Sequence, residues 1–128
     1  MAEPSLWTVR FHVDFVPEWR ALPARVKVEA GAVLDAMRRL GPELGRPQVD
    51  TLTTKRRIRH RNLKEIRCRV DGKVWRFIFA FDPRQHAIVL CGADKQGRNE
   101  ARFYETMIDL AVARYEDHLK DLNDVEDS

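Results

Sequence analysis

Apolar and polar residues follow two different periods along this chain. They alternate with a period of two over residues 7–13, which predicts a half-buried first strand. A short helix is expected next, holding Phe15, Trp19 and Leu22. Over residues 23–40 apolar residues recur at steps of three and four, which predicts a longer helix with one apolar stripe.

The middle of the chain predicts a meander of three strands after a loop at residues 42–54. The strands cover residues 63–70, 74–81 and 87–93. Asp71-Gly72 and the Asp82-Pro83 segment make short turns between them, so neighbouring strands should be antiparallel. A last helix is expected from about Glu100 to Leu122.

This order of elements predicts an α+β domain, in which an N-terminal strand and the meander form an antiparallel sheet packed by two N-terminal helices and a C-terminal helix. We expect helices on one sheet face, with function on the partly open other face. The domain should span residues 1–122, followed by an acidic, disordered tail at 123–128. The two cysteines predict no disulfide framework, and no apolar run is long enough to span a membrane; both point to the cytoplasm.

Charge is unevenly distributed although the net charge is only +3. Residues 55–76 hold ten Lys or Arg against two acidic residues, and residues 116–128 hold six acidic residues against one Lys. This distribution predicts a surface that binds a polyanion such as RNA. The RNA-binding candidates are the basic residues of the loop and the first meander strand: Lys55, Arg56, Arg57, Arg59, Arg61, Arg67 and Arg69.

Strand alternation places Glu65, Arg67 and Arg69 on one face, and Arg76 on the matching face of the next strand. Like charges opposed across a sheet destabilise it, so this group should hold an anion or pair with Glu65. A solvated face with scattered ion pairs is the favoured interpretation for Arg69. Arg76, which lies among aromatic residues, favours anion binding.

Candidate chemistry extends to the segment after the last strand, where Lys95 and Arg98 precede the last helix. The sequence contains no metal-ligand cluster, P-loop or dinucleotide motif, so neither a metal nor a small-molecule cofactor is expected. A metal-free RNase needs cations for the phosphorane and groups that move protons. The candidates for stabilising the phosphorane are Arg76, Arg98 and Lys95. The candidates for moving protons are His60, Lys64 or Tyr104. Tyr104 is equally compatible with a place in the core.

Several segments together resemble the RelE/ParE toxin superfamily, and most closely its HigB-like, phage-derived branch. They are Gly45-Arg46-Pro47 with Val49-Asp50, the strand Leu63-Lys64-Glu65-Ile66-Arg67, the strand Trp75-Arg76-Phe77-Ile78-Phe79-Ala80-Phe81-Asp82, and Asp94-Lys95 followed by Arg98 and Phe103-Tyr104. The resemblance covers roughly residues 11–119.

The resemblance implies a type II toxin that cuts mRNA on the ribosome by 2′-hydroxyl attack and is silenced by a cognate helix-turn-helix antitoxin. By position, Arg76, Lys64, Arg98 and Tyr104 match basic and tyrosine residues of the family's site. Arg98 and Tyr104 lie further apart than in RelE, and His60 alone can match the family's histidines. A gyrase-targeting ParE-type toxin and an inactive RNA- or partner-binding prophage remnant remain as alternatives.

Overall fold

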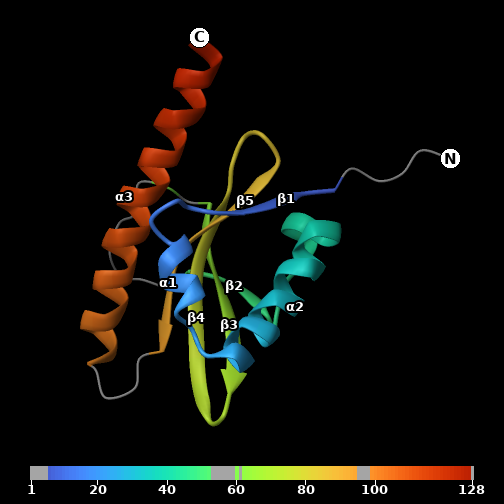
Figure 1. Cartoon of the computed structure of the whole chain (residues 1–128), viewed down its shortest axis with the longest axis vertical. Helices are drawn as coiled ribbons and strands as arrows, with labels where there is room; N and C mark the ends of the chain where they lie inside the picture. The colour runs from blue at the N-terminus through green and yellow to red at the C-terminus, as the bar shows by residue number, and fades with distance from the viewer. Residues whose placement is uncertain (1–5, 53–59, 61, 95–98, 128) are drawn as a thin grey trace, which may run out of the picture.

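A five-stranded sheet forms the centre of the molecule (Figure 1), for which a computed structural model describes residues 6–52, 60, 62–94 and 99–127. The strands follow the order β1-β5-β4-β3-β2 across the sheet. They are β1 (Thr8–Phe11), β2 (Val49–Thr51), β3 (Leu63–Val70), β4 (Lys73–Phe81) and β5 (His86–Asp94). The helices are α1 (Val16–Arg20), α2 (Ala24–Leu40), the 3-10 turn η1 (Gly41–Glu43) and α3 (Glu100–Asp127).

The predicted α+β class and the antiparallel meander of β3, β4 and β5 are confirmed. Asp71 and Gly72 turn the first hairpin with φ values of 52° and 79°. Positive φ at both central residues is the geometry that Asp-Gly favours in two-residue hairpins. The turn therefore sets the register of β3 and β4, which pairs Arg67 with Arg76.

Two features of the sheet were predicted wrongly. β1 pairs with β5 in parallel, so the sheet is mixed rather than wholly antiparallel. β2 lies within the predicted loop and pairs with β3 at the far edge. Its three residues are too few to show a period of two, and β2 is held by its pairing with β3 and by the burial of Val49.

Helices cover both faces of the sheet (Figure 1), which corrects the expectation that they would cover one. Phe77 and Phe79 of β4 are buried against Phe15, Val26 and Met37 on the face that α1 and α2 cover. The alternate residues of the same strand face α3: Ile78 and Ala80 pack with Phe103, Met107 and Ile108.

The open part of the sheet is therefore limited to the end where α3 begins, near Arg76 and Tyr104. The backbone of α3 is helical to Asp127, beyond the predicted end at Leu122, and the division of the chain at that residue stays a prediction. None of the helices in the described part of the chain is both long and apolar enough to cross a membrane.

Candidate functional site

Arg76 and Tyr104 form the centre of a polar cluster where α3 begins. Arg76 lies on β4 between Arg67 of β3 and Ala93 of β5, and is only 9% exposed. Its Cζ lies 5.0 Å from the centroid of the Tyr104 ring, within the range of a cation–π interaction. The ring therefore helps to hold a nearly buried guanidinium at a fixed place on the sheet.

Glu65 connects the other members of the cluster. Its carboxylate is 1% exposed and accepts a hydrogen bond from Arg67 Nε at 2.6 Å and from Tyr104 Oη at 3.1 Å. The predicted pairing of the arginine face with Glu65 is thus confirmed for Arg67. We call Glu65, Arg67, Arg76 and Tyr104 the arginine–tyrosine cluster.

Burial and charge act on the titrating members of this cluster. Burial, followed by the negative charge of Glu65, raises the pKa of Tyr104 to about 12. The hydrogen bond to Glu65 raises the pKa of Arg67. At neutral pH Tyr104 is therefore a protonated phenol, which can donate a proton or a hydrogen bond and cannot serve as a resting base.

A cavity of about 320 Å³ lies beside the cluster. Three arginines line it, namely Arg67, Arg69 and Arg76, together with Pro47, Cys68 and Val74. Arg67 and Arg69 are exposed while Arg76 is nearly buried, so the arginines line the hollow from its rim to its floor. Guanidinium groups bind phosphate oxygens through paired N–H donors, so the arrangement suits a phosphate group.

Two predicted proton-transfer residues lie away from the cluster. Lys64 occupies the opposite face of β3, with its Nζ 6.0 Å from the Phe81 ring. His60 lies beside the C-terminal half of α3, where its Nε2 is 3.2 Å from Glu116 and its ring contacts Tyr115. Glu116 lies twelve positions after Tyr104 on the helix, which corresponds to about 18 Å along the axis. Of these three candidates, the structure brings only Tyr104 to Arg76.

The remaining predicted site residues lie outside the described part of the chain. They are Lys95 and Arg98 of the candidate catalytic set, and Lys55, Arg56, Arg57, Arg59 and Arg61 of the candidate RNA-binding set. Ala93 pairs with Arg76, and Asn99 caps the first turn of α3 by accepting a hydrogen bond from the Arg102 N–H at 3.1 Å.

A family model described as phage-derived protein Gp49-like matches residues 17–116. The chain belongs to this Gp49-like family. The match confirms the resemblance to the phage-derived branch that the sequence indicated, and it covers every described member of the arginine–tyrosine cluster.

Two relatives of the Gp49-like chain are the toxin candidates HigB2 and HigB3 of Mycobacterium tuberculosis. HigB2 is 37% identical over 94 residues, which are 73% of this chain and 45% of HigB2. HigB3 is 41% identical over 86 residues, which are 67% of this chain and 70% of HigB3. The chain thus spans less than half the length of one relative and about two thirds of the other.

Among solved structures, a double-arginine mutant of the E. coli toxin RelE in the free state gives a TM-score of 0.48 at 14% identity. The match covers 80% of this chain and 94% of that chain.

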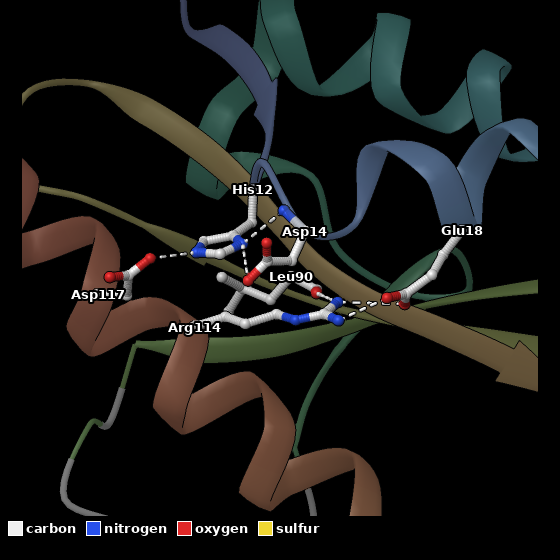
Figure 2. A network of polar contacts seen from close by, with 6 residues as sticks. All are labelled: His12, Asp14, Glu18, Leu90, Arg114 and Asp117. Carbon is white, nitrogen blue, oxygen red and sulfur yellow. Dashed lines mark hydrogen bonds and ion pairs between the residues drawn. The ribbon is translucent and has the colours of Figure 1, made fainter.

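The C-terminal half of α3 in this Gp49-like protein is fastened by a separate polar network (Figure 2). Arg114 donates hydrogen bonds to Glu18 of α1 at 3.1 Å and to the Leu90 carbonyl of β5 at 2.8 Å. Asp117 lies 2.8 Å from His12 Nε2. These contacts join α3 to the β1 edge of the sheet and to α1.

Sequence reasoning missed a second cluster of titratable side chains. Asp82 Oδ2 lies 2.7 Å from His86 Nδ1 and 2.7 Å from His118 Nε2. These three ligand-type side chains come together from distant positions in the sequence, which is why no local motif indicated them. Burial acts to raise the pKa of Asp82, but the hydrogen bonds from His118, from His86 and from the Arg84 backbone outweigh it and lower that pKa.

Proposed function

We propose that this Gp49-like protein is the toxin of a type II toxin–antitoxin pair, and that it cuts mRNA on the ribosome without a metal. The strand is broken by attack of a 2′-hydroxyl on the adjacent phosphate, which places the protein in the cytoplasm with the ribosome. Family membership and the similarity to the toxin candidates HigB2 and HigB3 support the toxin role.

One observation carries the nuclease proposal, namely the cavity that Arg67, Arg69 and Arg76 line. Three guanidinium groups line one hollow, and a phosphate bound there would accept hydrogen bonds from their N–H donors. Arg76 is nearly buried and rests against Tyr104, so its orientation is set before the RNA arrives. Preorganised charge of this kind stabilises the transition state more than a mobile surface residue would.

The reaction forms one bond and breaks one bond at phosphorus. The 2′-hydroxyl gives up its proton to solvent water and its oxygen bonds to phosphorus, which gives a pentavalent phosphorane with extra negative charge. The bond to the 5′-oxygen then breaks, and that oxygen takes up a proton. The products are a 2′,3′-cyclic phosphate and a free 5′-hydroxyl. Charge on the phosphorane is where cations contribute most.

The residues of the arginine–tyrosine cluster suit different parts of this reaction. Arg76 stabilises the phosphorane from the floor of the cavity, and Arg69 binds the incoming backbone at its rim. Tyr104 supplies a proton toward the 5′-oxygen, since it is protonated at neutral pH. Glu65 is a positioning residue, because it orients Tyr104 and Arg67 through its two oxygens. Lys95 and Arg98 stay predicted contributors of positive charge.

The toxin role requires a partner that silences it. We propose a helix-turn-helix antitoxin encoded beside the toxin, with a segment that covers the cationic cavity. An acidic segment would be attracted to three guanidinium groups at close range. Co-expression with the neighbouring reading frame should restore growth, and the Arg69→Ala variant should bind that partner more weakly.

The decisive experiment compares Arg76→Ala with wild type and with a matched arginine control. Arg38 provides the control, because it is 51% exposed on α2 and pairs with Asp35 away from the cavity. Each protein is induced in cells, growth is followed, and primer extension maps new 5′ ends on an abundant mRNA. We expect arrest and new ends with wild type and Arg38→Ala, and the loss of both with Arg76→Ala.

Other outcomes would identify other functions. Arrest with intact mRNA and DNA-damage signalling would indicate a gyrase-directed toxin and contradict the nuclease proposal. A wild-type protein that causes no arrest would indicate a binding module. The folded state of Arg76→Ala is checked by circular dichroism, and Arg69→Ala, at the exposed rim, provides a second variant that should reduce cleavage without risk to the core.

A further inference from the structure

Asp82, His86 and His118 meet at the end of the sheet remote from the arginine–tyrosine cluster. Asp82 follows β4, His86 begins β5, and His118 lies in the C-terminal half of α3. One ligand atom from each of them lies within 4.8 Å of the other two. His118 lies fourteen positions after Tyr104, which corresponds to about 21 Å of helix, so this group is separate from the cavity that we assign to RNA.

The Asp82 carboxylate is oriented by the backbone. Its Oδ1 accepts hydrogen bonds from the Arg84 N–H at 2.8 Å and the His86 N–H at 2.9 Å. These two bonds fix the β4–β5 turn and direct Oδ2 toward the two imidazoles, each 2.7 Å away. The Asp82 side chain is fully buried, with 0% of it exposed.

We propose that Asp82, His86 and His118 form a binding site for a divalent transition-metal ion of the Zn²⁺ class. Two imidazole nitrogens and one carboxylate oxygen are ligands that Zn²⁺, Co²⁺ and Ni²⁺ accept. The backbone bonds to Oδ1 act as the outer shell that holds a metal-binding carboxylate in place.

Two of the three ligand-atom separations require little adjustment. Metal–nitrogen and metal–oxygen bonds of about 2.0–2.1 Å separate neighbouring ligands by roughly 3.3 Å in a tetrahedral site. The present nitrogen–oxygen distances of 2.7 Å therefore have to open by about half an ångström. His86 and His118 are 17% and 14% exposed, which lets water complete the coordination from the solvent side.

The metal would link three elements, namely the end of β4, the start of β5 and the C-terminal half of α3. His118 stacks on Tyr115 within α3, while Asp82 and His86 belong to the β4–β5 hairpin. Replacing two hydrogen bonds with coordinate bonds would fasten the end of α3 to the sheet more strongly. Because binding requires unprotonated nitrogens on the side that faces Asp82, metal and protons compete for the site.

The alternative is that the group is only a hydrogen-bonded clasp, in which both imidazoles donate to Asp82. The test uses variants that keep those hydrogen bonds but remove the imidazole ligands. His86→Asn retains a donor at the position of Nδ1, and His118→Gln retains one at the position of Nε2. His12→Gln is the matched control, because His12 Nε2 contacts Asp117 at 2.8 Å in the same way.

The full chain is stripped with EDTA, and its thermal unfolding is followed as Zn²⁺ is added. We expect a saturable rise in Tm of roughly 10 °C when free Zn²⁺ is about 100-fold above its Kd. His12→Gln should show the same rise, and His86→Asn and His118→Gln should bind at least about 10-fold more weakly. The proposal is overturned if wild type shows no saturable rise, or if the rise persists unchanged in both ligand variants.

A second measurement needs no variant and covers the case in which a variant does not fold. Co²⁺ is added to isotopically labelled wild-type protein, and the imidazole signals of the four histidines are followed by NMR. The signals of His86 and His118 should shift or broaden first. Earlier effects on His12 or His60 would contradict the assignment of the site.

Discussion

The two halves of α3 contact the sheet in different ways. Near its start, Tyr104 packs on Arg76 beside a cavity that three arginines line, and the Glu65 carboxylate pairs with one of them, Arg67. Near its end, all four histidines of the chain contact carboxylates: His12 with Asp117, His60 with Glu116, and both His86 and His118 with Asp82.

We propose that the first region binds an anion, whereas the contacts of the second region hold α3 against the sheet. At the C-terminal end of α3, hydrogen-bonded side chains satisfy each other's polar groups within the folded chain. These contacts stabilise the packing of α3 on the sheet. Repulsion between arginines that line one cavity lowers the stability of the folded protein, and an anion bound there would offset that repulsion. Substitutions at the two ends should therefore affect different measurements.

The largest effect is expected for Tyr104→Phe on RNA cleavage. The ring and its cation–π contact with Arg76 remain, and only the hydroxyl that donates to Glu65 is lost. Loss of a general acid lowers the rate by about 100-fold or more. Single-turnover cleavage of a ribosome-bound mRNA measures this effect, and Tm shows whether the fold has changed. A rate within a factor of three of wild type would remove Tyr104 from the reaction.

At the other end of α3, Asp82→Ala should act on stability. The substitution removes the acceptor of two backbone N–H bonds and two imidazole contacts, at a side chain with no exposure. Leaving these buried groups unsatisfied costs about 2–4 kcal/mol of the free energy of unfolding. Urea unfolding in EDTA measures the loss, while cleavage per folded molecule should stay unchanged. Asp82→Asn keeps the backbone acceptor and should lose less; equal losses would show that the backbone bonds do not matter.

Local signals explain what the sequence predicts correctly. Asp71-Gly72 forms a tight turn through its local backbone preference alone. The alternation of residues along β4 places Phe77 and Phe79 on the face opposite to Arg76, and this can be predicted without knowledge of tertiary contacts. The pairing of Arg67 with Glu65 follows from the same alternation, since the two residues are neighbours on one face.

What the sequence does not predict depends on distant parts of the chain. Tyr104 reaches Glu65 across 39 positions, and His118 reaches Asp82 across 36, with no spacing rule to indicate either contact. The parallel pairing of β1 and the position of α3 on the second face are likewise set by how the layers pack. The resemblance to the toxin family places Lys64 in one site with Arg76. Strand alternation puts the Lys64 side chain on the other face of β3.

The smallest expected effect is on the pH dependence of the free energy of unfolding, to which the hydroxyl of Tyr104 contributes. Its pKa is raised from the ordinary value of 10.0 to about 12, so the folded state holds the phenol proton more tightly than the unfolded chain. That contribution to stability is fully present below pH 10 and is lost as pH rises toward 12. Urea unfolding across this window should show a steeper decline for wild type than for Tyr104→Phe. Tyr115, whose pKa is also raised, is common to both proteins, so its effect cancels in the difference. Identical declines would mean that Tyr104 does not lie buried against Glu65, and the proposed proton donor at the cavity would then lack its orienting partner.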